Sequence, residues 1–235
     1  MLAAIDRSAH RLVSVRRHGV ERTLVVLAPD ERLAYMRLAA TAAPGVEAAL
    51  TDRVVANRVA SSSADPPTFA LRPWRVERRS FAGALRELAG AHRTLVFADV
   101  AACYPSIGPR LVRTSLETIG AVGGREVEAF LARLARAGVP GLPVGPEPSA
   151  LFANAVLAHV DRALEARGIA HLRWVDDVVL GLGAPDEASG GLGVIRSALR
   201  ELGLRPNERK TRVVVDPGAL VATPSGVRGR AVRVG

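Results

Sequence analysis

The spacing of apolar residues is typical of helices in several long segments. In residues 46–60 and 124–138, apolar residues recur every three or four positions, which is the period of an amphipathic helix. Residues 1–60 are predicted to be mostly helical, with a break at Ala43–Gly45, and the polar segment 61–68 to be a loop. Helices are predicted at 30–42, 46–60, 80–91, 108–120, 124–138, 147–168 and 189–204.

Shorter apolar segments predict strands. Residues 93–100 and 211–215 are apolar runs of strand length, and 170–183 contains two such runs separated by Asp176 and Asp177. The two runs are joined so closely that they are predicted to form an antiparallel hairpin. No internal repeat or long linker divides the chain. We therefore expect an α+β fold with a largely antiparallel sheet.

Two adjacent carboxylates interrupt this apolar hairpin. Polar residues between strands are often only turn residues, and that interpretation of Asp176 and Asp177 stays open. Asp99, however, ends another apolar strand, and buried charges are rare unless they are paired or bind a metal. If these strand ends are neighbours, three carboxylates meet, and such hard oxygen ligands suit Mg²⁺. The pattern thus indicates a metal site for phosphoryl transfer.

The composition is that of a globular, strongly basic protein. Hydrophobic residues make up 49% of the 235, and the net charge of +9 favours a polyanionic partner, nucleic acid first, over a merely solvated basic surface. Aromatic residues are only 4%, which argues against a wide base-stacking surface. We expect a cytoplasmic protein with no membrane partner, because there is no long apolar segment or signal core and Cys103 is the single cysteine.

The basic residues are almost all arginine. The chain has 32 lysine and arginine residues, of which only Lys210 is lysine, and this leaves 31 arginines. Arginine stays protonated near neutral pH, whereas lysine can release its proton when its surroundings lower its pKa. Lys210 is therefore a candidate for proton transfer, with chance retention and a simple salt bridge as the alternatives.

Other common chemistries lack their sequence patterns. The five histidines do not cluster, and there is no HExxH or CxxC pattern, which argues against zinc. The phosphate-binding pattern GxxxxGK[ST] is also absent, so the chain does not have the signature of a P-loop nucleoside triphosphatase.

Four motifs in order resemble the palm of reverse transcriptases. They are "FADVAACYPSI" (97–107), "GLPVGPEPSALFAN" (141–154), "RWVDDVVL" (173–180) and "LGLRPNERKT" (202–211). Each is weak alone, but four in the family's order with plausible gaps are a strong signal. The resemblance covers residues 93–215 and implies a right-hand polymerase palm, preceded by a fingers-like region.

The resemblance implies roles for the candidate residues. Asp99 and Asp176 would be the principal ligands of Mg²⁺, with Mn²⁺ as a substitute. Asp177 would support them, and the carbonyl of Val100 would add an oxygen. Lys210 lies where the family places a lysine near the departing pyrophosphate, which it would protonate as a general acid.

Further positions would contact the incoming nucleotide. Tyr104 lies five residues after Asp99, where the family places an aromatic ring that collides with a ribose 2′-hydroxyl; a core aromatic is the alternative. Pro143, Val144 and Gly145 would form the loop against nucleotide and template.

Two polar residues and two arginines complete the predicted site. Ser149 and Asn154 would lie on the helix behind the loop, where capping and packing are the alternative. Arg53 and Arg58, on the presumed fingers helix, could contact the triphosphate, although with so many arginines a solvated helix face is favoured.

Some features depart from the common family pattern. Val144 replaces a frequent glutamine, and the form of the second motif is closest to bacterial abortive-infection and defence-associated reverse transcriptases, some of which work without a template or prime on protein. Only 25 residues follow Lys210, so a thumb would have to come from a partner protein, a structured RNA or a second copy, or the chain is a fragment. The expected regions are fingers (1–92), palm (93–216) and a short basic tail (217–235).

The favoured function is RNA-directed DNA synthesis from deoxynucleoside triphosphates on a primer 3′-hydroxyl, in bacterial phage defence. The alternatives are template-independent or protein-primed DNA synthesis, a palm that only binds nucleic acid within a larger complex, and an unrelated Mg²⁺-dependent phosphohydrolase.

Overall fold

The structure is a computed structural model that describes residues 10–17, 20–65, 67–217, 222–223, 226–227 and 231–232. The strands are β1 (His10–Arg17), β2 (Val20–Leu27), β3 (Val59–Ala64), β4 (Pro67–Leu71), β5 (Thr94–Asp99), β6 (Ala170–Trp174), β7 (Asp177–Leu182), β8 (Arg212–Val215), β9 (Ala222–Thr223), β10 (Gly226–Val227) and β11 (Ala231–Val232). The helices are α1 (Pro29–Ala49), α2 (Trp74–Ala91), α3 (Cys103–Ser106), α4 (Pro109–Thr118), α5 (Gly124–Arg136), α6 (Glu147–Glu165), α7 (Ala188–Glu201) and a short 3₁₀ turn, η1 (Pro185–Glu187).

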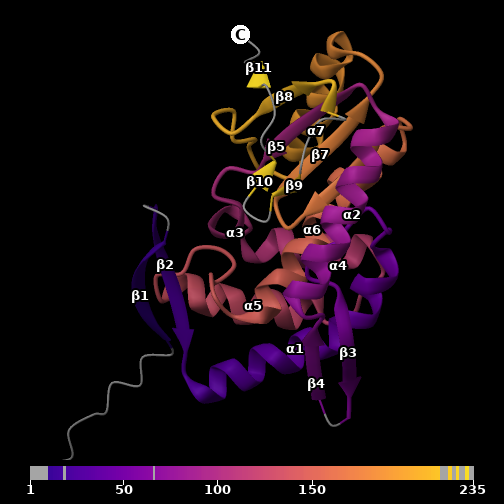
Figure 1. Ribbon diagram of the computed structural model, residues 1–235. Coiled ribbons are helices and arrows are strands. Elements are labelled where there is room, and N and C mark those ends of the chain that lie inside the picture. Colours follow the sequence, from indigo (N-terminus) through magenta and orange to yellow (C-terminus); the bar gives the residue numbers. More distant parts are fainter. Residues whose placement is uncertain are drawn as a thin grey trace, which may run out of the picture.

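An antiparallel sheet carries the two predicted strands and the predicted hairpin. Within the described residues its strand order is β11-β8-β5-β7-β6, and every neighbouring pair is antiparallel (Figure 1). Its central strand is β5, which pairs with β7 on one side and β8 on the other. The expected α+β fold with a largely antiparallel sheet is confirmed.

Helices pack on both faces of the sheet. Along β5, Val96 and Ala98 join the main hydrophobic core with α6 and α7, whereas Leu95 and Phe97 belong to a second cluster with α2. This alternation follows from the two-residue period of a strand. Asp99 continues the series of Leu95 and Phe97, so the first candidate carboxylate lies on the α2 face of the sheet.

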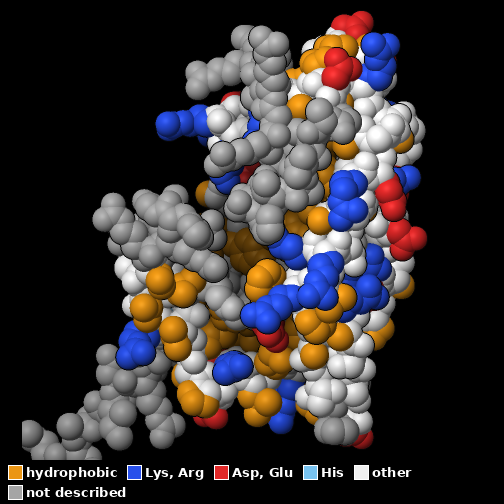
Figure 2. Space-filling view, in the orientation of Figure 1, with side chains coloured by type: hydrophobic (Ala, Val, Ile, Leu, Met, Phe, Trp, Pro, Cys, Tyr) orange, Lys and Arg blue, Asp and Glu red, His pale blue; other side chains and the backbone are white. Residues whose placement is uncertain are grey.

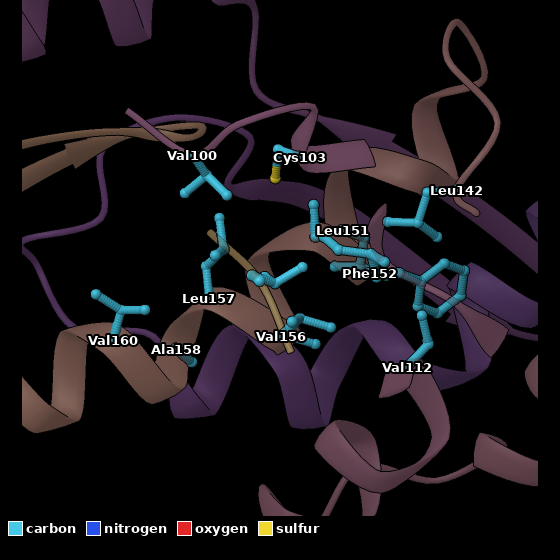
Figure 3. Packing of buried hydrophobic residues seen from close by; sticks show 14 of the residues in the cluster. Val100, Cys103, Val112, Leu142, Leu151, Phe152, Val156, Leu157, Ala158 and Val160 are labelled. Atoms are coloured by element: carbon cyan, nitrogen blue, oxygen red, sulfur yellow. The ribbon is translucent and has the colours of Figure 1, made fainter. Parts of the chain in front are cut away.

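Helix α6 is the centre of the main core. Leu151, Phe152 and Val156 are fully buried, and Figure 3 shows them among side chains from other elements, including Val100 after β5 and Val112 of α4. A helix that is apolar on nearly every side must be surrounded by protein. Because α6 follows directly after the loop 138–146, its burial fixes the position of that loop.

The N-terminal region is not mostly helical, which corrects the sequence prediction. Strands β1 and β2 form one hairpin, and β3 and β4 form another where a polar loop was expected. Valine-rich segments such as 20–27 favour strands, but the serine-rich β3 has no apolar alternation that would reveal it. Arg53 and Arg58, expected on a helix, lie in the segment between α1 and β3.

Helix α1 continues through the predicted break at Ala43–Gly45. Pro44 lies inside the helix and removes one backbone donor, which normally ends a helix. Burial of the flanking residues outweighs this cost, since Ala43 and Val46 are fully buried. A Cβ on Gly45 would lie 2.7 Å from the Cα of Ala121, so glycine is what allows α1 to pass this close to the chain after α4.

The predicted helices from α4 to α7 are confirmed to within a few residues at their ends. The basic tail predicted at 217–235 lies mostly outside the described residues; of its described parts, β11 pairs with β8. Among the described residues, no helix is long and apolar enough to cross a membrane.

Candidate active site

The three predicted carboxylates meet at one end of the sheet. Asp99 is the last residue of β5 and Asp177 the first of β7, and the two are directly opposite each other in the antiparallel ladder. Residues in this relation project from the same face of a sheet. Asp176 occupies the turn just before Asp177. The hairpin and the strand end are thus neighbours, as the sequence predicted.

Crowding of these carboxylates changes their protonation. Burial, reinforced by the negative charges of Asp176 and Asp99, raises the pKa of Asp177 to about 6, although part of its side chain is exposed. Asp99 itself is only 5% exposed. Carboxylates held close together in this way favour either a proton or a cation between them.

The donor set fits Mg²⁺ in its chemistry. Among the described residues, no three acidic, histidine or cysteine side chains are already arranged to hold a metal ion. Mg²⁺ usually takes one or two protein carboxylates and completes its octahedron with substrate phosphates and water. Asp99 and Asp176 line the cleft and would supply such a pair.

Both oxygens of the Asp99 carboxylate have protein partners. Asn207 Nδ2 donates to Oδ1 at 2.8 Å, and Lys210 Nζ donates to Oδ2 at 2.6 Å. This hydrogen bond raises the pKa of Lys210, so the ammonium stays charged. The salt bridge that was one alternative for Lys210 is therefore present. Asn207 belongs to the quoted fourth motif, but its bond to Asp99 was not foreseen.

The segment after β5 is also tied to the loop that carries Lys210. Asn207 N donates to Asp99 O at 2.7 Å and Ala101 N donates to Arg205 O at 2.9 Å, on either side of Val100. These two bonds do not use the Val100 carbonyl. The Val100 carbonyl oxygen, which was predicted to be a metal ligand, is next to Asp99 in the chain and takes part in neither of these two hydrogen bonds.

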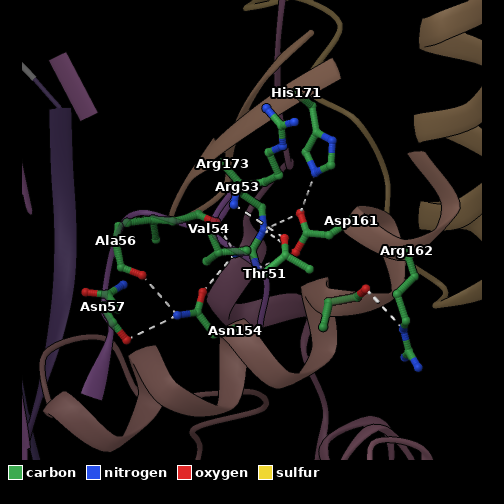
Figure 4. A network of polar contacts seen from close by, with 12 residues as sticks. Thr51, Arg53, Val54, Ala56, Asn57, Asn154, Asp161, Arg162, His171 and Arg173 are labelled. Carbon is green, nitrogen blue, oxygen red and sulfur yellow. Dashed lines mark hydrogen bonds and ion pairs between the residues drawn. The ribbon is translucent and has the colours of Figure 1, made fainter. Parts of the chain in front are cut away.

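A buried arginine holds the turn that carries Asp176. Val175 has φ 59°, a left-handed conformation that is rare for a β-branched residue. Arg173 is fully buried, and its Nη1 donates to Val175 O at 2.9 Å. The same Nη1 donates to Asn154 Oδ1 at 2.8 Å (Figure 4). Its Nε and Nη2 make bonds of 2.7–3.0 Å to the Asp161 carboxylate. The guanidinium therefore links this turn to α6.

The Asp161 carboxylate stays charged in the protein interior. Burial alone would raise its pKa, but the charge of Arg173, the hydrogen bonds from Arg173 and the nearby His171 outweigh burial, so the pKa lies below its usual value. His171 Nε2 is 3.5 Å from Asp161 Oδ1. The site is thus supported by a buried ion pair that the sequence analysis did not foresee.

Asn154 connects the same network to the segment before β3. Its Nδ2 donates to Ala56 O at 3.0 Å and to Asn57 O at 3.2 Å. On the other side, the buried Glu77 of α2 accepts from Asn57 N at 2.9 Å and from Arg58 N at 2.8 Å. Asn154, predicted only to lie behind the loop, is a structural residue that joins α6 to this segment.

Arg58 does not have the predicted position. Its Nε and Nη2 each contact Glu47 Oε1 at 2.8 Å, and its Nη1 donates to Thr51 O and Val54 O at 2.9 Å. With its guanidinium engaged in this way, Arg58 is not among the residues that line the cleft, and its role is to shape the turn after α1. Among the described residues, Arg72 is the arginine that lines the cleft.

The predicted nucleotide residues divide between the cleft and the interior. Tyr104, Val144 and Gly145 line the cleft, whereas Pro143 is buried. Leu142 N donates to Tyr104 O at 2.9 Å. A Cβ on Gly141 would lie 2.5 Å from that same oxygen. Loop and tyrosine are therefore packed together as one unit.

A chain of hydrogen bonds holds the loop from behind. Ser149 Oγ donates to Pro143 O at 2.7 Å, and so the Tyr35 hydroxyl, 3.1 Å away, donates to Ser149 Oγ. On the other side of the loop, Val25 N donates to Val144 O at 2.8 Å. Ser149 thus holds the loop in position through Pro143 O, which is close to the capping and packing role that was the alternative in the sequence analysis.

These elements enclose one cleft of about 1110 Å³. Asp99, Asp176, Asp177, Lys210, Tyr104 and Val144 are among the residues that line it. A cleft of this size has room for a nucleotide.

An antiparallel sheet backed by helices, with aspartates at the end of a central strand and in the adjacent hairpin, is the architecture of a polymerase palm. The chain matches the family model described as "Reverse transcriptase (RNA-dependent DNA polymerase)" over residues 44–227, and it therefore belongs to the reverse transcriptase family. Enzymes of this family are nucleotidyltransferases, and they generally use divalent metal ions.

A solved telomerase structure shares the fold, and a second is similar with a lower score. Apo telomerase from Candida tropicalis matches with a TM-score of 0.53 and 11% identity, over 92% of this chain and 45% of that chain. Telomerase from Candida albicans in complex with the TWJ fragment of telomeric RNA matches with a TM-score of 0.49 and 12% identity, over 91% and 44%. The chain thus spans less than half the length of these proteins. No curated protein matches it in sequence.

Proposed function

We propose that the chain catalyses RNA-directed DNA synthesis, in which a primer 3′-hydroxyl attacks the α-phosphate of a deoxynucleoside triphosphate and pyrophosphate leaves. The observation that carries the proposal is the pairing of Asp99 with Asp177 across β5 and β7, beside Asp176, at a nucleotide-sized cleft in a member of this family. A palm that only binds nucleic acid would not need three carboxylates that repel one another.

Asp99 and Asp176 would hold Mg²⁺, or Mn²⁺ in its place, with Asp177 and the Val100 carbonyl in support. When bound, such ions lower the barrier by activating the attacking oxygen and stabilising the leaving one. Lys210 lies against Asp99 with a charged ammonium, and we assign it the general acid role for the leaving pyrophosphate.

The proposed division of the chain is a fingers region at 1–92, a palm at 93–216 and a basic tail at 217–235. The template and primer are nucleic acids, as the net charge of +9 supports.

Primer extension with Mg²⁺ and labelled deoxynucleotides tests this function. Parallel reactions contain an RNA template, a DNA template or no template, and an Asp176→Ala/Asp177→Ala variant is the control. We expect extension on RNA that is absent from the variant. Extension on DNA alone, or equal activity in the variant, would refute the proposal. Products without any template would instead establish template-independent or protein-primed synthesis.

The form of the second motif supports a role in phage defence. Val144 replaces the frequent glutamine at the edge of the cleft, as in the bacterial defence-associated members that this motif resembles. Wild-type protein expressed in a bacterial host is expected to reduce phage plating, and the Asp176→Ala/Asp177→Ala variant is expected not to. Equal plating with both proteins would remove this role.

Tyr104 is proposed to exclude ribonucleotides. Its half-buried ring lines the cleft, and the bond from Leu142 N to the Tyr104 backbone carbonyl holds the main chain that carries the ring. Rejection of a single extra hydroxyl by shape is worth up to about 100-fold. Tyr104→Ala should therefore reduce the preference for deoxynucleotides, measured as the ratio of kcat/KM values, by about that factor. Tyr104→Phe keeps the ring and should retain the preference; loss in both variants would contradict a steric role.

A further inference from the structure

A second cavity lies on the far side of the loop that carries Val144. Its volume is about 380 Å³, and it is bounded by β2, the N-terminal part of α1 and residues 145–148. Strand β2 lies beside this loop, where Val25 N donates to Val144 O at 2.8 Å (Figure 1). Gly145 lines this cavity, called here the β2–α1 cavity, and also the active-site cleft. A molecule bound in the β2–α1 cavity therefore contacts the same loop that faces the cleft.

The walls of the β2–α1 cavity are mostly apolar. Leu24 and Val26 of β2, Met36 of α1 and Pro148 of α6 are among the residues that line it. Val26 is 46% exposed, and Figure 2 shows hydrophobic side chains at the surface over the hairpin of β1 and β2. Concave apolar sites of roughly 300–1000 Å³ are typical of small-molecule binding, and apolar surface leaves water when such a site is filled. The cavity is thus suited to a small ligand with an apolar body.

Arg32 gives the cavity a positive charge. Its side chain is exposed and lines the cavity, and within the described residues its guanidinium has no acidic partner. The neighbouring Glu31 is bonded to Arg133 instead. Glu147 also lines the cavity, but it lies in the first turn of α6, where the helix dipole stabilises a carboxylate. Arg32 is therefore the charge that a ligand can neutralise.

We propose that the β2–α1 cavity binds a small organic anion with an apolar body. The anionic group pairs with Arg32, and the apolar body fills the space between β2 and residues 145–148. The Tyr35 ring forms part of the wall, whereas its hydroxyl is already bonded to Ser149. An anion is favoured over a neutral ligand of the same shape because hydrogen bonds between ionised groups are the stronger ones.

Occupancy of the cavity also acts on the loop. Empty space leaves the atoms of the walls without contacts on one side, and a ligand supplies those contacts. A bound ligand therefore holds Gly145 and Pro146, both of which also line the cleft, in their observed position. The ligand thereby strengthens nucleotide binding. This consequence rests on the proposed function, whereas binding of the anion does not.

The first test is a fluorescence titration of the full chain with anilinonaphthalene sulfonate, an aromatic organic anion, without nucleotides or Mg²⁺. Phenylnaphthylamine, which has a similar aromatic body but no sulfonate, is the neutral probe. The anion is expected to bind about 10- to 150-fold more tightly, as one hydrogen bond to a charged group implies, and Arg32→Gln should remove this difference. Arg37→Gln, on the same helix and also exposed but outside the cavity, is the matched control and should bind both probes as wild type does.

Two further variants locate the probe. Met36→Trp places a larger ring in the cavity and should prevent binding of both probes. Arg72→Gln removes a positive charge from the cleft and should leave binding unchanged. Weaker binding in Arg72→Gln with normal binding in Arg32→Gln would place the anion in the cleft and overturn the proposal. Equal affinity of wild type for the two probes would overturn it as well.

The effect on the loop is measured in primer extension. A saturating concentration of the anionic probe is expected to lower KM for the deoxynucleotide about 5-fold, the lower end of typical coupling between sites, with kcat unchanged. Arg32→Gln should show no such shift. An unchanged or raised KM in the wild type would overturn the effect on the loop. Binding of the anion with these properties in a protein that extends no primer would refute the proposed function and leave the cavity as a binding site.

Discussion

Replacement of Arg173 by methionine is expected to lower the free energy of unfolding by about 3–5 kcal/mol. Among the described residues, Arg173 is the one that makes several hydrogen bonds to the Asp161 carboxylate, and the substitution removes them all. Asp161 is only 2% exposed, so water does not replace these bonds easily. His171, at 3.5 Å, is then the nearest group that can share its charge. An unpaired charge in the interior costs far more than the pair itself contributes.

Urea denaturation measures this effect. Arg136→Met on α5 removes an exposed arginine and should change the free energy of unfolding by no more than about 0.5 kcal/mol. A loss below about 1 kcal/mol in Arg173→Met would mean that water or a rearranged His171 compensates the buried carboxylate. Asp161 would then not depend on the hydrogen bonds from Arg173 that Figure 4 shows.

A double variant separates the stability of the network from its effect on the turn. Arg173→Met/Asp161→Leu removes both charges, and apolar replacement of a buried pair is often neutral for stability. The double variant still lacks the hydrogen bond from Arg173 to Val175 O. Val175 has a left-handed backbone conformation, which costs of order 1–3 kcal/mol, and this hydrogen bond no longer stabilises it. We expect the free energy of unfolding to recover, while kcat of primer extension is lower than in the wild type because the turn that carries Asp176 has lost this support. Recovery of both would show that Arg173 does not position Asp176.

The sequence predicted the elements with strong periodicity. In α5, Val127, Phe130, Leu131 and Leu134 follow helical spacing, and all four are buried. Strands β1 and β2 were missed because residues 1–60 were predicted to be mostly helical, although valine-rich segments such as 20–27 favour strands. Strand β3 was missed because its serine-rich sequence has no apolar alternation. Tertiary contacts, which a local pattern does not contain, decide such segments.

The carboxylates of the site could be predicted because a charged residue at the end of an apolar strand is rare unless it is paired or binds a metal. The same argument applied to Arg173, an arginine in an apolar strand, but its signal was lost among 31 arginines. Arg58 is the opposite case. It was predicted to contact the triphosphate, but its guanidinium is bonded to the Glu47 carboxylate and to two backbone carbonyls. Only the structure separates arginines that face the cleft from those that hold the backbone.

Asp176→Asn is expected to reduce the rate of nucleotide addition about 1000-fold or more. Stabilisation by a metal ion is worth several kcal/mol of the barrier, and each 1.36 kcal/mol corresponds to a factor of ten. Asparagine keeps the shape of the side chain but removes the charge that would hold Mg²⁺. Asp186→Asn, in the exposed turn before α7, is the matched control and should retain full activity.

The same variant has a second readout that does not depend on catalysis. The raised pKa of Asp177 means that, without metal, this group contributes stability while protonated, and that the contribution is lost as the pH rises through about 6. Because Asp176 is one cause of that shift, Asp176→Asn should bring the pKa of Asp177 closer to its ordinary value and make the thermal stability less dependent on pH between about 4 and 6.

At pH 8, Mg²⁺ should raise the Tm of the wild type and of Asp186→Asn, because a cation bound between the carboxylates stabilises only the folded state. It should have little effect on Asp176→Asn. An equal Mg²⁺ response in all three proteins would place the ion elsewhere, and the lost activity of the variant would then need a cause other than metal binding.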